Sequence, residues 1–326
     1  MSEFDLIDLI RARVAAHDGV VLGIGDDAAL LRVPEGHELV VTADTLNAGV
    51  HFPDGTAPAD IGWKALAANL SDLASMGARP AWCTLSLSLP DADRGWLEAF
   101  LDGFLELAAL HGIALVGGDT TRGPLSIAVT AMGLVETGAA LRRDRARAGD
   151  DVWVTGTLGD AAAALVLGGH APPPSGSALP VADASDSSFL AQRRDRPTPR
   201  VEAGRALLGL ARACVDVSDG LLADLGHVCE RSGVGAEVQV AALPASAALR
   251  SVFGGQGQLL QAGGGDDYEL CFTAPPPLRD AVASALEQAG VEGTRIGRIV
   301  AGAGVRALAA DGTDWHPPRA GYVHFG

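Results

Sequence analysis

The sequence predicts an α/β (α+β) protein of two domains, and three observations support this. The chain has 326 residues, and since single domains usually hold fewer, two domains of about 150 residues each are expected. Hydrophobic residues make up 48% of the chain, which is enough material for two cores. Segments with the two-residue period of strands alternate along the chain with segments of helical period.

The first half alternates between helices and strands. Leu66, Leu70 and Leu73 recur at helical spacing and form one apolar stripe. HELVVTAD (37–44) is expected to be a buried strand, and the alternation in WCTLSLSLP (82–90) predicts a half-buried one. The expected elements are, in order, a helix at 3–16, a strand at 37–44, a helix at 59–78, a strand at 82–90, a helix at 93–110 and strands at 113–119 and 125–135.

A polar, charged run at 136–151 marks the domain boundary, so the domains are expected at residues 1–137 and 148–326. Pro, Ser and Asp are frequent in 171–198, which predicts a surface excursion that contributes no core element. The second half is expected to hold strands at 151–156, 214–217, 236–240, 268–273 and 294–300, and helices at 159–167, 201–211, 221–233 and 278–290.

Composition excludes several classes of protein. Forty acidic residues against 24 basic ones give a formal charge of −16, which disfavours binding to nucleic acid or to anionic membranes. The N-terminus lacks the pattern of a signal peptide, and no run of uncharged apolar residues is long enough to span a membrane. The four cysteines are widely spaced without a CxxC motif, which favours reduced, buried thiols. Together these features predict a cytoplasmic location.

Aspartates recur at the ends of predicted strands and in glycine turns beside apolar segments. Asp44 and Asp119 are expected at strand ends, and Asp216 and Asp219 bracket the turn that follows another strand. Ligands of α/β proteins collect at such ends. Asp72 is expected at the edge of the buried face of its helix, where a carboxylate is costly unless it is paired. Two doublets add to this set, Asp26-Asp27 and Asp266-Asp267.

A divalent cation is the partner that the composition favours for these carboxylates. Lys64 is the only lysine, and no arginine lies within the GIGDD, VTAD or NLSD motifs. Oxygen ligands without histidine or cysteine are typical of Mg²⁺, which usually bridges protein carboxylates to substrate phosphates. The alternative for any single aspartate is turn or cap chemistry, and for Asp219 the alternative is capping of the helix that follows it.

No Walker A motif is present, and Lys64 lies in a helix, so the lysine schemes of P-loop enzymes and protein kinases are excluded. Glycine backbones and arginines would then have to contact phosphates. GGDTTRGP (117–124), Arg143 and the glycines of TGTLGDAAAAL are candidates. For Arg143 the alternative is a solvated linker charge. His51 follows Asp44 within a short loop, where a structural role is the alternative.

Eight stretches in order along nearly the whole chain, apart from 171–198, resemble the thiamine-monophosphate kinases. This family belongs to the PurM-like (aminoimidazole ribonucleotide synthetase-like) ATP-dependent enzymes. The stretches are GIGDDAALL, TADTLNAGVHF, KALAANLSDLASMGARP, LVGGDTTRGP, VTGTLGDAAAAL, DVSDGLLADLGH, GGGDDYELCFT and GYVHF.

The resemblance implies ATP-dependent phosphorylation of thiamine monophosphate to thiamine diphosphate, with release of ADP, in thiamine biosynthesis. It also implies two PurM-like domains, a homodimer formed through the N-terminal ATP- and Mg-binding domains, and several Mg²⁺ ions with ATP as co-substrate. Carried over by position, the metal ligands are Asp27, Thr42, the backbone of Ala43, Asp44, Asp72, Asp119, Asp216 and Asp219. The implied ATP contacts are Gly118, Asp119, Arg143 and Ser218, and the implied substrate contacts are His51, Asp266 and Tyr322.

One position departs from the family pattern, which usually reads GGEDYEL where this chain has Asp266. Asp267 or a water molecule is a candidate to replace the longer side chain. The expected chemistry is direct in-line phosphoryl transfer, with no residue assigned as nucleophile or base. Three alternatives are a sibling enzyme of the same fold, a divalent-metal phosphohydrolase and a non-catalytic metal- or nucleotide-binding protein.

Overall fold

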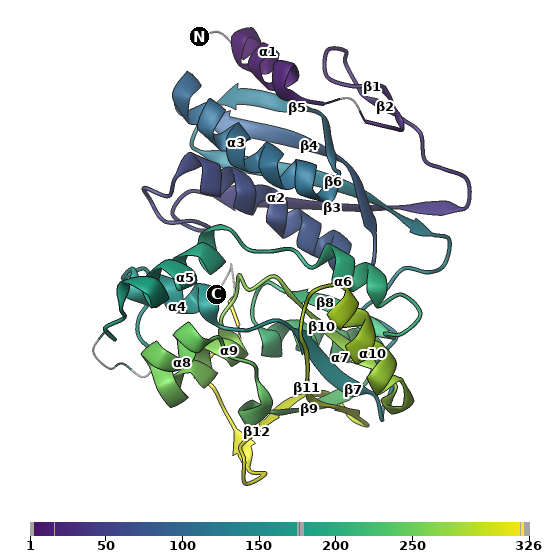
Figure 1. Ribbon diagram of the computed structural model, residues 1–326, viewed down its shortest axis with the longest axis vertical. Coiled ribbons are helices and arrows are strands. Elements are labelled where there is room, and N and C mark those ends of the chain that lie inside the picture. The colour runs from purple at the N-terminus through teal and green to yellow at the C-terminus, as the bar shows by residue number, and fades with distance from the viewer. Residues whose placement is uncertain (1–2, 16, 175, 177–178, 320, 323–326) are drawn as a thin grey trace. The chain divides into compact units, whose positions relative to one another are not determined.

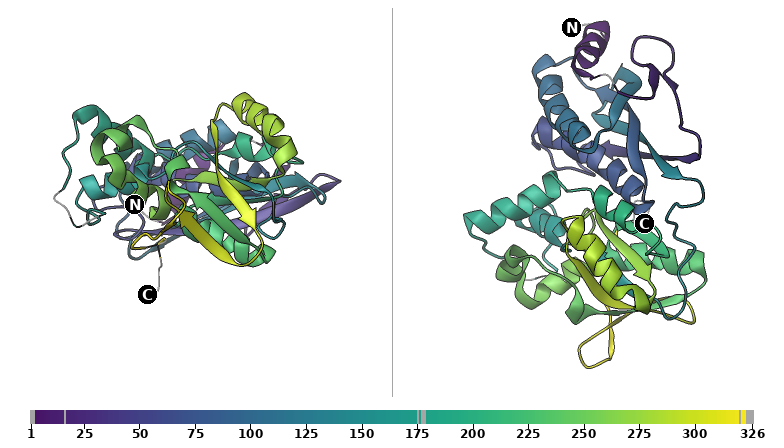
Figure 2. Two further views of the ribbon diagram at one scale, coloured as in Figure 1. Left: turned by 90° about the horizontal axis from the view of Figure 1, so that it is seen from below. Right: turned by 45° about the vertical axis from the view of Figure 1, so that its right-hand side comes forward.

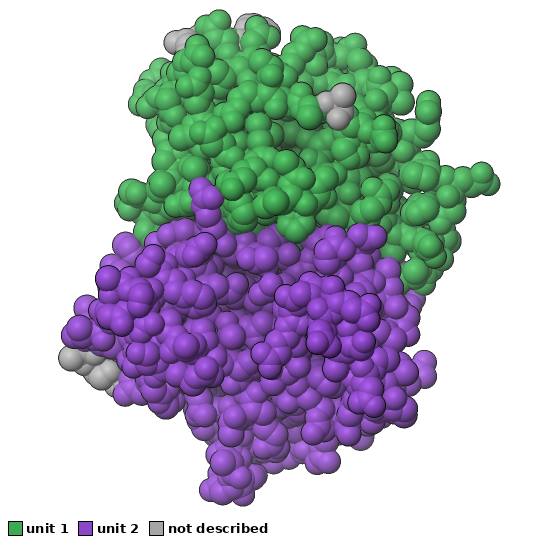
Figure 3. Space-filling view, in the orientation of Figure 1, with its two compact units in different colours: residues 1–73, 78–139 green, residues 74–77, 140–326 purple. Residues whose placement is uncertain are grey.

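The computed structural model describes residues 3–15, 17–174, 176, 179–319 and 321–322 (Figure 1, Figure 2). The chain divides into two compact units. Unit 1 consists of Met1–Leu73 and Ala78–Ala139, and unit 2 consists of Ala74–Gly77 and Ala140–Gly326 (Figure 3). Each unit combines a β-sheet with helices, in agreement with the predicted fold class.

Unit 1 contains a mixed sheet with helices packed on it. Its elements are α1 (Glu3–Arg13), β1 (Val20–Leu22), β2 (Leu30–Leu31), β3 (His37–Asn47), α2 (Pro58–Ser75, whose last residues belong to unit 2), β4 (Arg79–Leu89), α3 (Arg94–His111), β5 (Ala114–Arg122) and β6 (Ser126–Glu136). The main sheet has the order β3-β6-β4-β5. Its pairs are antiparallel except for β4 and β5, which are parallel. β1 and β2 form a separate antiparallel pair.

Helices α2 and α3 lie side by side against the main sheet of unit 1 (Figure 1). They approach each other closely at two glycines, since a Cβ at Gly62 would overlap the carbonyl oxygen of Phe100 and one at Gly103 would overlap that of Ala59. Side chains there would push the helices apart. The predicted leucine stripe of α2 is confirmed, because these residues are fully buried: Leu66, Leu70 and Leu73.

Strand β3 differs from the short, buried strand that was expected. It continues past Asp44 because Thr45–Asn47 extend the ladder with β6. As an edge strand it exposes 43% of Leu39 and 57% of Val41. Asp119 likewise lies inside β5 and not at its end, because the β-branched threonines after it continue the strand. The expectations of burial and of these two strand ends were therefore wrong.

Unit 2 is built on a larger sheet. Its strands are β7 (Asp151–Thr155), β8 (Ala213–Val217), β9 (Gly235–Gln239), β10 (Glu269–Ala274), β11 (Gly293–Val300), β12 (Gly304–Leu308) and β13 (Asp314–Trp315). Its α-helices are α4 (Asp160–Leu167), α5 (Ala184–Asp195), α6 (Val201–Ala206), α7 (Leu221–Ser232), α8 (Ala247–Phe253), α9 (Gly257–Gly263) and α10 (Arg279–Gln288). Short 3₁₀ turns lie at Val240–Ala242, Gly254–Gln256 and Pro276–Leu278.

The sheet of unit 2 has the order β13-β12-β9-β11-β7-β10-β8. Its pairs are antiparallel except for β9 and β12. All residues of β7, β8 and β10 are buried. Because β8 and β10 run antiparallel, with Val217 opposite Glu269, the residues that follow β8 lie beside the residues that precede β10. This pairing determines where the candidate site residues of unit 2 meet.

Part of the segment expected as a surface excursion belongs to a core. Helix α5 begins after Asp183, whose side chain accepts a hydrogen bond from the Asp186 backbone at 2.8 Å. It packs against α4 and α8, and Leu190 is fully buried in an apolar cluster with Leu249 and Phe253. The expectation was wrong for this helix because its polar sequence buries a single leucine, which leaves no helical period to detect.

All four cysteines are buried and free, as predicted. Burial raises the pKa of the Cys229 thiol to about 11, and it also raises the pKa of the other three thiols, so their role is packing and not thiolate chemistry. Across the described residues, no helix combines the length and the apolar character needed to cross a bilayer.

We predict that Asp151→Asn destabilises the protein in a pH-dependent way. Asp151 accepts from Arg279 Nε at 2.6 Å and Nη2 at 2.8 Å, and this bond holds the pKa of Asp151 below its ordinary value of 3.8. Because 47% of the Arg279 side chain is exposed, the loss in unfolding free energy at pH 7 should be only about 1 kcal/mol.

A carboxylate with a lowered folded-state pKa contributes stability above its unfolded-state pKa and loses it as the pH falls through the folded-state value. The difference between wild type and variant should therefore be constant from neutral pH down to about pH 5 and shrink below about pH 4. Urea unfolding at several pH values measures this. Asp314→Asn, which removes an exposed pair with Arg306, is the control; a pH-independent difference for Asp151→Asn would contradict the assignment.

Candidate phosphate and metal site

A cavity of about 770 Å³ in unit 1 brings together predicted residues from two parts of the chain. One wall is the loop between β1 and β2, which carries Asp27, and another is β5 with Gly118 and Asp119. Gly118 has φ 152°, and a Cβ there would overlap the carbonyl oxygen of Leu85, so only glycine fits this position. Three of the predicted residues therefore share one cavity.

The GIGDD loop is arranged around its own aspartates. The Asp27 backbone N–H donates to Asp26 Oδ1 at 2.8 Å, and Gly25 adopts φ 126°. The guanidinium of Arg11 lies against this glycine, since a Cβ on Gly25 would be 3.1 Å from Arg11 Cζ. Arg11 also lines the cavity with Asp119. The sequence analysis missed it because helical periodicity does not distinguish one solvent-facing arginine of α1 from another.

A second group in unit 1 joins β3 to α2. The Thr42 hydroxyl donates a hydrogen bond to Asp72 Oδ2. Asp44 lies two residues after Thr42 and therefore on the same face of β3, whereas the Ala43 side chain points to the other face. Burial, and then the charge of Asp72, raise the pKa of Asp44 to about 6. Two carboxylates thus repel each other across the strand and the helix.

The donor atoms of this group fit a hard divalent cation. Asp44, Asp72 and Thr42 offer only oxygen, the donor that Mg²⁺ prefers. One turn before Asp72, the buried amide oxygen of Asn69 accepts no hydrogen bond within the described part of the chain. Among the described residues, no three acidic, histidine or cysteine side chains converge closely enough to hold a metal ion. The Asp44–Asp72 pair would therefore leave most of the coordination shell to water and substrate oxygens.

His51 is fixed by a residue whose role the sequence analysis missed. His51 Nδ1 accepts a hydrogen bond from the Asn47 backbone N–H at 3.0 Å. The backbone carbonyl oxygen of His51 accepts a hydrogen bond from Lys64 Nζ at 2.9 Å. Lys64 is buried, with 3% exposed. The single lysine among 24 basic residues was the available signal, because an isolated exception to a strong composition bias indicates a specific local requirement.

In unit 2 the turn after β8 is organised by Asp224. The backbone N–H groups of Ser218, Asp219 and Gly220 donate to one Asp224 oxygen at 3.1, 3.1 and 3.0 Å. Burial, and then the charge of Asp219, raise the pKa of Asp224 to about 7, while these N–H groups oppose the shift. The N-cap residue of α7 is Gly220 and no side chain caps the helix, so Asp219 does not have the alternative capping role. Asp216, the other predicted ligand here, is buried in β8 with 2% exposed.

The remaining predicted residues of unit 2 surround the same turn, except for Arg143. The Asp266 backbone N–H donates to the Ser218 carbonyl at 2.8 Å, and the Tyr322 N–H donates to the Asp219 carbonyl at 2.9 Å. The Tyr268 hydroxyl donates to Asp266 Oδ1 at 3.1 Å. Ser218, Asp219, Asp266 and Tyr322 are thus brought together by backbone contacts.

Asp267 cannot replace the longer acidic side chain that the family usually has at 266. It is buried, with 1% exposed, and its Oδ2 accepts from the Gly159 backbone at 2.8 Å. The Gly159 N–H lies at the start of α4, where the glycines of TGTLGDAAAAL predicted an anion site. In the structure this N–H donates to the Asp267 carboxylate of the chain itself.

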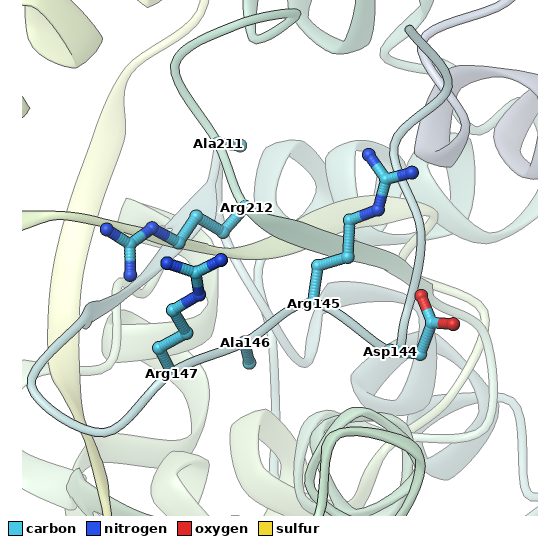
Figure 4. A pocket seen from close by; sticks show the side chains of 6 residues that line it. All are labelled: Asp144, Arg145, Ala146, Arg147, Ala211 and Arg212. Atoms are coloured by element: carbon cyan, nitrogen blue, oxygen red, sulfur yellow. The ribbon is translucent and has the colours of Figure 1, made fainter. Parts of the chain in front are cut away.

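Arg143 is not part of this group in unit 2. Its side chain is exposed and makes no hydrogen bond or ion pair with any described residue. The residues after it line a second cavity, of about 430 Å³, together with residues just before β8. The arginines of this cavity are Arg145, Arg147 and Arg212 (Figure 4). Arg212 immediately precedes β8, whereas Ser218 follows it, so this cavity lies at the opposite end of the strand.

Comparison with known proteins adds a family. Residues 25–135 match the model of the AIR synthase related protein N-terminal domain, and residues 147–309 match that of the C-terminal domain. A thiamine-monophosphate kinase of Salmonella typhimurium is 46% identical over 99% of this chain and 98% of its own length. That of Bacillus subtilis is 38% identical over 84% of this chain and 83% of its own length.

Solved structures agree with these sequence matches. The crystal structure of thiamine-monophosphate kinase from Stenotrophomonas maltophilia has a TM-score of 0.86 and 56% identity, covering 97% of this chain and 98% of that one. AaThiL complexed with AMPPCP and TMP has a TM-score of 0.77 and 33% identity, covering 99% of this chain and 97% of that one.

We predict that Asp224→Ala destabilises the protein by about 2 kcal/mol, because one buried and two half-buried backbone donors lose their acceptor. Chemical denaturation followed by circular dichroism measures the change. Asp280→Ala removes an exposed acid from the first turn of α10 and should change stability by less than about 0.5 kcal/mol. Equal losses in the two variants would show that Asp224 contributes only through the helix dipole.

Proposed function

The chain belongs to the thiamine-monophosphate kinases, a family of AIR synthase related proteins, and from this premise we propose how its residues perform the transfer. The predicted enzyme class and the two-domain PurM-like fold are confirmed by the domain matches and by relatives that align over the full chain. The reaction of the family is ATP-dependent phosphorylation of thiamine monophosphate. A structure of the 33% identical AaThiL holds AMPPCP and TMP.

The proposed chemistry is direct in-line transfer. An oxygen of the thiamine monophosphate phosphate attacks the γ-phosphorus of ATP, the bond from that phosphorus to the β-phosphate oxygen breaks, and ADP leaves with the electron pair. The attacking oxygen is already anionic, so the reaction needs no strong general base and no covalent nucleophile. Two polyanions have to meet, and charge neutralisation is therefore the main requirement for catalysis.

Carboxylates of both units are proposed to hold Mg²⁺, which when bound neutralises charge on the phosphates. The Asp44–Asp72 pair is the observation that supports this most directly: Asp44 has a pKa of about 6 because burial and the charge of Asp72 disfavour its ionised form, and a bound cation would relieve both effects. The proposed ligands are Asp27, Thr42, the backbone of Ala43, Asp44, Asp72, Asp119, Asp216 and Asp219.

Substrate contacts are proposed from the positions carried over from the family. Gly118 and Asp119, on the cavity wall of unit 1, and Ser218, on the turn held by Asp224, are suited to contact ATP phosphates and their cations. Arg143 is proposed as an ATP contact whose exposed guanidinium is free to swing toward a ligand. His51, Asp266 and Tyr322 are proposed to contact thiamine monophosphate.

A cytoplasmic homodimer is also proposed. Unit 1 exposes large apolar side chains on β1, β2 and β3 and on the loops that follow β2 and β3, and exposed apolar residues that form a contiguous patch mark an association surface. They include Val21, Leu30, Val33, Leu39, Val41 and Val50. Four free, buried cysteines are compatible with a reducing compartment.

Product analysis tests the function. The purified protein is incubated with ATP, Mg²⁺ and thiamine monophosphate, and the products are resolved by chromatography. Equal amounts of thiamine diphosphate and ADP, formed only when the acceptor is present, are expected. Phosphate release without acceptor would indicate a phosphohydrolase, and nucleotide binding without any product would indicate a non-catalytic protein.

We predict that Asp72→Asn and Asp219→Asn each lower kcat by about 100-fold or more, because each removes a proposed ligand for the cation. Isothermal titration with Mg²⁺ and ATP should show weaker metal binding in both variants, while the melting temperature changes little. Asp280→Asn, at an exposed position of α10, is the matched control. Near-normal turnover of Asp72→Asn at saturating Mg²⁺ would contradict the proposed ligand role.

We predict that Val41→Asp converts the dimer to a monomer, because a charge on the exposed face of β3 cannot be buried at an interface without a partner. Light scattering coupled to size-exclusion chromatography measures the mass. Val181→Asp, at a residue of unit 2 that is 95% exposed, should leave the mass unchanged. A wild-type protein that already runs at 33.1 kDa would refute the dimer itself.

A further inference from the structure

A buried cluster of charges in unit 2 adjoins the loop that carries Asp266. At its centre is Glu269, whose side chain is 0% exposed. Arg200 donates to both Glu269 oxygens, from Nε at 2.6 Å and from Nη2 at 2.6 Å. Arg193 Nη2 adds a bond of 2.9 Å, and the Thr155 hydroxyl adds one of 2.8 Å. Arg193 belongs to α5 and Arg200 lies just before α6, so distant segments converge on one carboxylate.

Two more buried carboxylates belong to this cluster. Asp160 lies 3.5 Å from Arg193 Nε. Burial raises the pKa of Asp267 well above its usual value. Arg193 lies within ion-pair distance of the buried carboxylates of Asp160 and Glu269, and Arg200 pairs with Glu269. Removing one member of such a buried cluster leaves another charge uncompensated.

The loop next to this cluster has an unusual backbone. Asp266 and Tyr268 are the non-glycine residues with positive φ among the described residues, at 65° and 50°. Residues other than glycine rarely adopt this backbone conformation, and it persists only where the surrounding structure fixes it. Asp267 and Glu269, which alternate with these two residues, are both buried and hydrogen-bonded to other segments. The cluster therefore supplies the constraint that the loop needs.

We propose that Arg193 and Arg200 are positioning residues for the phosphoryl acceptor. By holding Glu269, they keep loop 264–268 in the conformation that presents the Asp266 carboxylate beside Ser218. This inference rests on the proposed assignment of Asp266 to the thiamine monophosphate site. It also gives a role to α5, which carries Arg193 into the cluster.

The effect should fall on the acceptor more than on the nucleotide. The Ser218–Gly220 turn has its own support in Asp224, and the Gly118–Asp119 wall of the first cavity is in unit 1. The Glu269 carboxylate is hydrogen-bonded to Thr155, Arg193 and Arg200 and not to either of these segments. Loss of an arginine should therefore misplace Asp266 while the residues proposed to contact ATP keep their positions.

Arg193→Gln is the variant of choice, because Glu269 keeps its hydrogen bonds to Arg200 and Thr155 and the fold should survive. We expect the KM for thiamine monophosphate to rise about tenfold and the KM for ATP to change by less than about twofold. Arg193→Lys, which keeps the positive charge, should recover part of the loss. Arg194→Gln is the matched control: it lies next along α5, but its guanidinium pairs with Asp195 at 2.7 Å.

Hydrogen–deuterium exchange of the ligand-free protein provides a readout that does not require activity. Amides of residues 264–270 should exchange faster in Arg193→Gln than in Arg194→Gln. If the wild type forms no thiamine diphosphate, the proposed function fails, but this difference in exchange would still support the positioning role. An equal rise of both KM values, or exchange in this segment that matches the Arg194→Gln control, would overturn the proposal.

Discussion

The cost of placing carboxylates in or near a protein interior is the constraint on which this structure depends. Three buried acids are compensated inside unit 2 in different ways. Asp224 accepts from three consecutive backbone N–H groups, Glu269 accepts from two arginines, and Asp267 accepts from Gly159 and has a raised pKa. In unit 1, by contrast, Asp44 and Asp72 face each other as like charges. The proposed cation would supply to this pair the positive charge that backbone N–H groups and arginines supply to the buried acids of unit 2.

Strand pairing brings the candidate site residues of unit 2 together. The antiparallel register of β8 and β10 sets the turn after Val217 beside the loop before Glu269. As a result Ser218 and Asp266 are joined by a backbone hydrogen bond although they are 48 positions apart in the chain. The buried Asp224 carboxylate then stabilises the turn, and the Glu269 carboxylate, held by two arginines, is proposed to stabilise the loop. Buried residues behind these two segments would thus determine where the proposed substrate contacts lie.

The reaction of the family explains why compensation from outside the chain is proposed. Transfer between two phosphates brings two polyanions together, and the chain itself carries a formal charge of −16. The proposed divalent cations between carboxylates and phosphates would offset this charge and would leave positioning as the task of the protein. The proposed support of Asp266 by the arginines behind its loop would be one instance of that task.

The sequence by itself determined the fold class, most helices and strands, the buried free cysteines and the family, because periodicity and motif spacing are local properties of the chain. It could not determine that β3 is an exposed edge strand or that Asp44 and Asp119 lie within strands, since apolar content does not reveal a strand's neighbours. It also could not determine that α5 belongs to the core, that Asp224 holds the Ser218–Gly220 turn and Lys64 the His51 carbonyl, or that Arg193 contacts Glu269. Those contacts join groups that are far apart in the chain and meet only in the folded interior. Tertiary packing therefore decides how each buried charge is compensated.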